Sequence, residues 1–240
     1  MQVAIVVYPG MTALDAVGPY EVLRFVPGAE IRFVSRKPGP VVTDSKVLVL
    51  EATHSYEETP SPDIVIVPGS EADTTTAMAD GALIGWLKRV HDTSRWTVSV
   101  CSGALVLASA GLLEGRPATT HWIAQRPLEQ MGAEARPNQR IVRSGKIVTA
   151  AGVSAGIDVA LWLVKETFGR RRAEIIQLIL EYDPQPPVDA GHPDKAVPEV
   201  RRAARSEMRR RMKNPRNVLS IPRILWRKGI GAVRRTVLRR

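Results

Sequence analysis

Three short apolar runs, each followed at once by turn residues and a helix-like pattern, constrain the fold of this 240-residue chain most strongly. The runs cover residues 3–7, 64–67 and 97–100, and they end at Pro9-Gly10, Pro68-Gly69-Ser70 and Cys101-Ser102-Gly103. Nearly continuous β-branched runs are typical of strands that are covered on both faces of a parallel sheet. The alternation predicts βαβ units and an α/β fold, in which ligands bind beyond the carboxyl ends of the strands.

The rest of the chain divides into a globular body and a tail. Further strands are predicted at 31–35, 47–50 and 146–149, and helices near 12–25, 81–92, 103–111, 122–132, 155–167 and 171–181. Five prolines between residues 184 and 198 predict an extended segment that ends the body. We therefore expect one domain at 1–198 and a tail at 199–240.

Charge separates the same two parts. The formal net charge is +10, but residues 201–240 hold 15 Lys and Arg against one acid, whereas residues 1–200 hold 19 basic and 23 acidic side chains. The tail ends in a basic amphipathic pattern, with Trp226, Ile230, Val233 and Val237 on one stripe. Binding to an anionic membrane surface or an acidic partner is one interpretation, and a tail that is disordered alone is the other. Specific DNA binding is disfavoured, because two prolines leave little room for a packed helix-turn-helix.

A single cysteine excludes an internal disulfide and favours a reducing compartment. No apolar run approaches the length of a transmembrane helix, and the N-terminus has no basic leader. We expect a cytoplasmic protein, which the tail could hold at the membrane periphery. The four histidines show no paired spacing, and neither a phosphate-binding nor a dinucleotide-binding glycine motif is present. The sequence thus predicts chemistry without metal or cofactor.

Cys101 is the main candidate for that chemistry. It follows a predicted buried strand, and the small residues after it open a helix, which is the pattern of a nucleophile elbow. The positive end of the helix would lower the pKa of the thiol toward neutrality. The alternative is that Cys101 fills space in the core as a small apolar side chain.

Asp15 is the candidate acid or base. It follows the first strand and would project over the strand ends toward Cys101, where partial desolvation would raise the pKa of its carboxyl. Thr12 and Asp15 also have the spacing of a helix capping box, so a purely structural role is the alternative.

The remaining candidates are three residues that follow predicted strands and one histidine. Backbone N–H groups of Gly69, Ser70 and Ser102 would together form an anion-stabilising pocket, although the first two also fit an ordinary turn. His121 opens a helix twenty residues beyond Cys101 and is a candidate base or orienting group, although a lone His is more often only hydrogen-bonded.

The motifs taken together resemble the ThiJ/PfpI branch of the class I glutamine amidotransferase-like superfamily. The resemblance rests on residues 14–21, 67–70, 99–103, 118–122 and 152–158, and on the stretches Leu180-Glu181-Tyr182-Asp183-Pro184-Gln185-Pro186-Pro187 and Ala190-Gly191-His192-Pro193-Asp194. Within that branch the chain is most similar to isonitrile hydratases, over about residues 2–198.

The resemblance implies a flavodoxin-like three-layer sandwich, a homodimer, no metal, and a catalytic Cys101 partnered by Asp15. Two positions depart from the usual pattern: Ser102 stands where Thr is usual, and Ser70 where Gly is usual. Both bear on the choice of substrate more than on the type of reaction.

The expected activity is cofactor-free hydration of a small-molecule isonitrile to an N-substituted formamide through a Cys101 thioimidate. Glyoxalase-like hydration of reactive carbonyls is the enzymatic alternative, because it uses the same thiol and acid. A non-enzymatic alternative is a small-molecule or redox sensor, related to the N-terminal domain of AraC-type regulators, with Cys101 as the sensing thiol.

Overall fold

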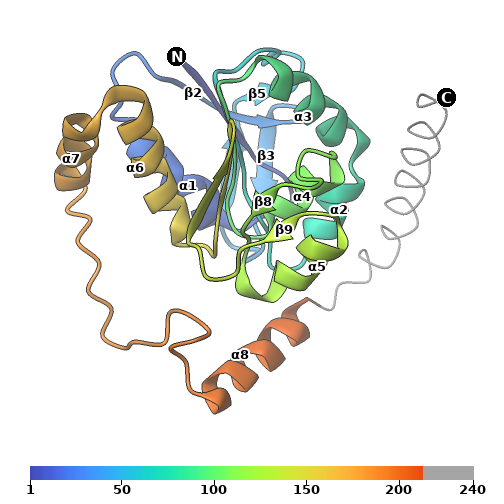
Figure 1. Ribbon diagram of the computed structural model, residues 1–240. Helices are drawn as coiled ribbons and strands as arrows, with labels where there is room; N and C mark the ends of the chain where they lie inside the picture. The colour runs from blue at the N-terminus through green and yellow to red at the C-terminus, as the bar shows by residue number, and fades with distance from the viewer. Residues whose placement is uncertain (213–240) are drawn as a thin grey trace.

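A seven-stranded sheet forms the centre of the computed structural model, which describes residues 1–212 (Figure 1). Its strands lie in the order β10-β11-β7-β6-β1-β2-β5. All neighbours are parallel except β10 and β11, an antiparallel pair at one edge. The bounds are β1 Gln2–Val6, β2 Glu30–Ser35, β5 His54–Ser55, β6 Ile64–Val67, β7 Trp96–Ser99, β10 Ile141–Ser144 and β11 Ile147–Ala150.

Burial follows the apolar runs. Every residue of β6, β7 and β11 is buried, because helices cover both faces of the sheet there. The register pairs Val3 with Ile64 and Ile64 with Trp96, so that β1, β6 and β7 end at nearly the same level. The turns that follow these three strands therefore meet at one edge of the sheet.

Helices form the two outer layers of the sandwich (Figure 1). On one face lie α1 Ala13–Leu23, α6 Ala155–Phe168 and α7 Arg170–Ile179. On the other face lie α2 Thr74–Ala79, α3 Gly81–Thr93, α4 Gly103–Ser109 and α5 Gln125–Gln130, with the 3-10 turn η1 Trp122–Ala124 before α5. The predicted three-layer α/β sandwich is confirmed.

Several predicted elements differ in detail. The helix expected at 122–132 is a 3-10 turn followed by the short α5, whose Pro127 has no N–H to donate. The strand expected at 47–50 is β4 Val49–Ala52, which pairs antiparallel with β3 Gly39–Val42 in a hairpin outside the main sheet. Two further short strands, β8 Pro117–Ala118 and β9 Glu134–Ala135, pair in parallel.

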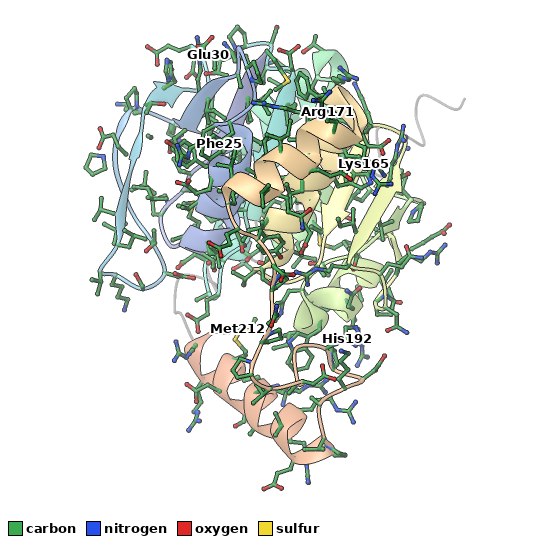
Figure 2. The ribbon with its side chains drawn as sticks, turned by 90° about the vertical axis from the view of Figure 1, so that its left-hand side faces the viewer. Phe25, Glu30, Lys165, Arg171, His192 and Met212 are labelled. Carbon is green, nitrogen blue, oxygen red and sulfur yellow. The ribbon has the colours of Figure 1, made fainter. Side chains whose placement is uncertain are left out.

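Beyond α7 the chain runs without regular structure to α8 Pro198–Arg211, which carries six Arg and two Glu. The predicted boundary at 198/199 falls at the first residue of this helix, where Pro198 occupies a favourable first-turn position. In Figure 2 the segment with His192 and the end of α8 at Met212 lie at the end of the molecule opposite Glu30. The amphipathic pattern that begins at Trp226 lies outside the described residues.

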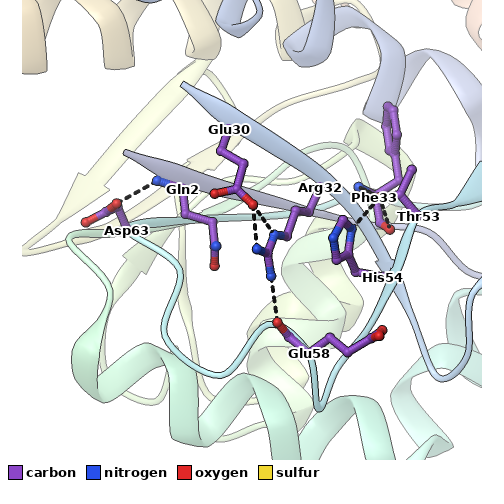
Figure 3. A network of polar contacts seen from close by, with 8 residues as sticks. All are labelled: Gln2, Glu30, Arg32, Phe33, Thr53, His54, Glu58 and Asp63. Carbon is purple, nitrogen blue, oxygen red and sulfur yellow. Dashed lines mark hydrogen bonds and ion pairs between the residues drawn. The ribbon is translucent and has the colours of Figure 1, made fainter. Parts of the chain in front are cut away.

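The amino ends of the central strands carry a polar network (Figure 3). Arg32 donates through Nε to Glu30 at 2.6 Å and through Nη1 to the Glu58 carbonyl at 2.6 Å. Asp63 accepts the Gln2 N–H at 2.7 Å beside it. These contacts join β1, β2 and the loop before β6 at the edge of the sheet away from the three turns.

Within residues 1–212, none of the helices has both the length and the hydrophobicity needed to cross a membrane.

Candidate active site

Cys101 lies in the sharp strand-to-helix turn between β7 and α4. Its φ is +57°, a left-handed conformation that costs a non-glycine residue about 1–3 kcal/mol and persists only where neighbours hold it. Here the Cys101 N–H donates to the Ala151 carbonyl at 2.8 Å, and Thr120 Oγ1 donates to the Cys101 carbonyl at 2.8 Å. The predicted elbow is therefore present, with its backbone fixed on both sides.

Two glycines let the turns after β6 and β7 cross closely. A Cβ on Gly103 would overlap the Val67 carbonyl oxygen. A Cβ on Gly69 would lie 2.5 Å from both the backbone nitrogen and Oγ of Ser102, and 3.0 Å from the Cβ of Cys101. Larger residues at either position would push the two turns apart, so these glycines set the approach of the β6 turn to the thiol.

Asp15 lies in the first turn of α1 and is fully buried. Its Oδ2 accepts the Gly69 N–H at 2.8 Å, so the carboxyl faces the β6 turn. Thr12, the expected capping partner, instead donates to Asp44 at 2.5 Å and makes no side-chain cap for α1. The capping-box alternative is therefore not realised.

Burial dominates the electrostatics of Asp15 and Cys101. It raises the pKa of Asp15 from 3.8 to about 7, against the lowering effect of the hydrogen bonds from Gly69 and Cys101. Burial also raises the pKa of the Cys101 thiol, and the charge of Asp15 raises it further. The expected lowering of the thiol pKa is therefore wrong for this structure, because burial and the charge of Asp15 raise the pKa more than the hydrogen bonds from Ser102 lower it.

The raised pKa values of Asp15 and Cys101 determine how many protons the pair holds. The thiol and the carboxyl share a hydrogen bond, and Asp15 Oδ1 has no N–H or O–H donor among the described residues. Near neutral pH the pair holds between one and two protons, since the Asp15 carboxyl is close to half-titrated. A proton can therefore move between sulfur and carboxylate without help from bulk water.

The amides proposed to bind an anion are differently placed. Gly69 N–H donates to Asp15, and Ser70 N–H donates to Ser102 Oγ at 3.0 Å, so both are engaged. The Ser102 N–H hydrogen-bonds the sulfur of Cys101 and lowers the pKa of its thiol. Of the three amides, Ser102 N–H is thus the one that faces the sulfur of Cys101.

Ser70 and Ser102 tie the turns together through their hydroxyl groups. Ser102 Oγ also donates to the Ser70 carbonyl at 3.1 Å and shares a hydrogen bond with Thr74 Oγ1 at 2.7 Å. Ser70 Oγ donates to the Gly10 carbonyl and accepts the Asp73 N–H at 2.7 Å. The serines at the two unusual positions therefore stiffen the loop that carries Gly69.

His121 lies beside the site without a hydrogen bond to Cys101. Its Nδ1 accepts the Ile123 N–H at 3.5 Å, and its ring lies against Gly152. Burial lowers the pKa of His121, so its imidazole is neutral at physiological pH. The following Trp122 ring lies 5.5 Å below the guanidinium of Arg205 in α8.

Tyr8 is a neighbour of the site that was not singled out from the sequence. Its buried hydroxyl donates to the Pro68 carbonyl at 3.0 Å, and the charges of Asp15 and Cys101 add to burial in raising its pKa. The signal was its position directly after the first apolar run. No group of three or more metal-ligating side chains occurs among residues 1–212.

Comparison with known proteins decides the family. The profile of the DJ-1/PfpI family matches residues 1–166. The chain belongs to the DJ-1/PfpI family. An isonitrile hydratase from Pseudomonas putida is 38% identical over 215 residues, which cover 88% of this chain and 93% of that enzyme.

Solved structures agree with this assignment. A THiJ/PfpI family protein from Pseudomonas syringae superposes with a TM-score of 0.83 at 36% identity, over 88% of this chain and 87% of that one. DJ-1beta of Drosophila melanogaster superposes with a TM-score of 0.68 at 19% identity, over 76% of this chain and 98% of that one. This second similarity concerns the fold alone.

Proposed function

We propose that residues 1–198 hydrate an isonitrile to an N-substituted formamide, with Cys101 as nucleophile and Asp15 as acid and base. The observation that carries the proposal is the buried thiol–carboxyl pair, in which the pKa of Asp15 is about 7. Similarity to an isonitrile hydratase over most of both chains supports the choice of substrate class.

The chemistry of an isonitrile explains why such a pair is needed. The terminal carbon of R–N≡C becomes electrophilic once it is protonated, so a proton and a nucleophile must reach the same atom. Cys101 and Asp15 share one proton in the reactive form, so the pair supplies both the nucleophile and the proton. An acid with a pKa near the working pH is suited to both giving and taking a proton.

In the first half-reaction the Asp15 carboxylate takes the proton of the Cys101 thiol and delivers it to the terminal carbon. The sulfur bonds to that carbon, which gives the thioimidate R–N=CH–S–Cys101 and leaves Asp15 ionised. The Ser102 N–H, which already faces the sulfur, supports the thiolate as it forms.

In the second half-reaction Asp15 activates a water molecule that adds to the thioimidate carbon. The proton taken from water passes to nitrogen, and the C–S bond breaks as the carbonyl forms, with the remaining hydroxyl proton returning to sulfur. The products are R–NH–CHO and the Cys101 thiol, so atoms and protons balance and no cofactor is consumed. Gly69 holds Asp15 in place, Ser70 and Ser102 brace that loop, and His121 lines the site as a neutral ring.

Formation of cyclohexylformamide from cyclohexyl isocyanide tests the proposal. Wild type and Ser109→Ala, a change at the far end of α4, should turn over. Cys101→Ala should be inactive, and Asp15→Asn should lose nearly all activity because an amide cannot relay the proton. Substantial turnover by Cys101→Ala would contradict the covalent scheme. Inactive wild type that releases D-lactate from methylglyoxal without glutathione would favour the carbonyl alternative.

We also propose that the protein is a homodimer. Helix α7 lies on the outside of the molecule, toward the viewer in Figure 2. It exposes Ile175, Leu178 and Ile179, with Leu178 80% exposed. An apolar stripe of this kind favours burial against another protein surface. Sedimentation of wild type and Leu178→Glu tests this: a dimer that the substitution dissociates supports the proposal, and a monomeric wild type contradicts it.

A further inference from the structure

Three side chains from distant segments meet on the side of Cys101 that is formed by the turn after β11. Arg140, just before β10, donates through Nε to Asp158 Oδ2 at 2.7 Å, and its Nη2 also pairs with that oxygen. Tyr182, beyond α7, donates to Asp158 Oδ1 at 3.1 Å. Both oxygens of this carboxylate are therefore occupied, in the first turn of α6.

The backbone of Arg140 connects this cluster to the elbow. Its carbonyl accepts the Ala151 N–H at 2.9 Å, and the Ala151 carbonyl in turn accepts the Cys101 N–H at 2.8 Å. The side chain of Arg140 meanwhile holds the start of α6 through Asp158 and also donates to Ser154 Oγ at 3.2 Å. One residue thus binds the turn 151–154 at both of its ends.

This attachment matters because Cys101 is held in a costly conformation. At φ +57° the residue relaxes toward ordinary backbone angles if the Ala151 carbonyl moves away. Rotation at this backbone would turn the thiol relative to Asp15, which is fixed separately by Gly69. A displacement of about 1 Å in a reacting group can lower a rate by about 100-fold.

The same cluster contributes little to global stability. The side chain of Arg140 is 51% exposed and that of Asp158 is 28% exposed. Half-exposed ion pairs contribute about 0–1 kcal/mol to the free energy of unfolding, because water screens them. The Asp158 carboxylate is nevertheless held at both oxygens, since two guanidinium nitrogens of Arg140 contact Oδ2 and the Tyr182 hydroxyl contacts Oδ1, so the cluster fixes geometry rather than adding much stability.

We propose that Arg140, Asp158 and Tyr182 form a positioning clamp, which keeps the Ala151 carbonyl on the Cys101 N–H and so aims the thiol at Asp15. The proposal deepens the proposed function, since it rests on Cys101 as the nucleophile. The clamp includes a residue beyond the 1–166 match, so the chain after α7 contributes to the chemistry of a site it does not touch.

The test compares Arg140→Gln with Arg32→Gln. Arg32 makes the same kind of pair, since Nε and Nη2 both contact one oxygen of Glu30, at the opposite end of the sheet (Figure 3). Two readouts are measured: kcat and KM for cyclohexyl isocyanide, and the rate at which iodoacetamide alkylates Cys101, the single cysteine, from pH 6 to 9.

Arg140→Gln and Asp158→Asn should lower kcat by about 10-fold to 100-fold with KM unchanged, and should alter the pH profile of alkylation. Arg140→Lys keeps the positive charge but lacks the two neighbouring nitrogens of the guanidinium, so it should lose less activity than Arg140→Gln. Arg32→Gln should match wild type in both readouts. Equal kinetics and equal alkylation in Arg140→Gln and Arg32→Gln would overturn the clamp. Alkylation of Cys101 does not require isonitrile turnover. An inactive wild type would therefore refute the proposed function, and the alkylation rates would still decide whether the clamp exists.

Discussion

Replacing Asp15 by Asn should stabilise the protein in a way that depends on pH. The pKa of Asp15 rises from 3.8 in an unfolded chain to about 7 in the fold, chiefly through burial. Between these values the folded protein keeps a proton that the unfolded chain has released. The free energy of unfolding of wild type therefore falls as pH rises, by about 1.4 kcal/mol per pH unit, and the fall ends above pH 7.

The magnitude follows from the shift. About three pKa units correspond to about 4 kcal/mol of destabilisation by this carboxylate above pH 7. The amide of Asn resembles the protonated acid in shape and does not ionise. The stability of Asp15→Asn minus that of wild type should therefore increase by about 3 kcal/mol between pH 5 and pH 8.

Urea denaturation followed by tryptophan fluorescence measures this difference at pH 5, 6, 7 and 8. Both proteins carry the same histidines, so the histidine contributions largely cancel in the difference. Measurements stop at pH 8 because the Cys101 thiol of the unfolded chain ionises above that value. A difference that stays constant from pH 5 to pH 8 would refute the reasoning, since it would mean that the folded environment leaves the carboxyl unperturbed.

Four further results are expected. A plot of log kcat/KM should fall with a slope of one per pH unit below about pH 7, because protonated Asp15 cannot take the thiol proton; a flat profile down to pH 5 would contradict this role. Gly69→Ala should cost about 1–3 kcal/mol in urea denaturation and reduce turnover, since its Cβ would lie 2.5 Å from Ser102; a fully stable, fully active variant would contradict the close crossing. Lys146→Met should destabilise by about 1–3 kcal/mol without changing kcat, because Lys146 Nζ donates to three carbonyls at the end of α3; unchanged unfolding would contradict that. If the basic tail binds membranes, the full chain should sediment with anionic phosphatidylserine vesicles at low salt and a chain ending at 212 should do so less; equal sedimentation of both would remove the tail from that role.

The central sheet and the elbow were predictable because the signals are local. A buried strand covered on both faces requires an apolar run, and runs at 3–7, 64–67 and 97–100 became β1, β6 and β7. The turn at Cys101 needed small neighbours, which Ser102 and Gly103 supply. Parallel strands then bring their carboxyl ends together, so Asp15 and Cys101 could be placed at one edge without a structure.

The electrostatics of the site were not predictable in the same way. The pKa of a thiol depends on how much water surrounds it, and the sequence indicates only the adjacent helix. Likewise, the direction of an N–H group depends on the loop conformation, so the sequence could name Gly69 and Ser70 without showing that their amides already serve Asp15 and Ser102. Such properties arise from contacts between segments that are far apart in the chain.

The clamp illustrates the same limit. Arg140, Asp158 and Tyr182 are 18 and 24 residues apart and share no spacing rule that would indicate contact. Only the packing of α6 against the sheet and the return of the chain after α7 bring them together. Helix α8 likewise begins at Pro198, where the run of prolines had indicated only an end to the body.

The central claim is that Cys101 forms a covalent thioimidate, and intact-protein mass spectrometry tests it most directly. Wild type mixed with cyclohexyl isocyanide and quenched in acid within milliseconds should gain the mass of one substrate molecule, and digestion of the quenched protein should locate that mass on the peptide that contains Cys101. The adduct should decay as cyclohexylformamide appears, and Cys101→Ala should gain no mass and form no product. Formamide produced by wild type with no adduct at any time, together with an active Cys101→Ala, would contradict the account.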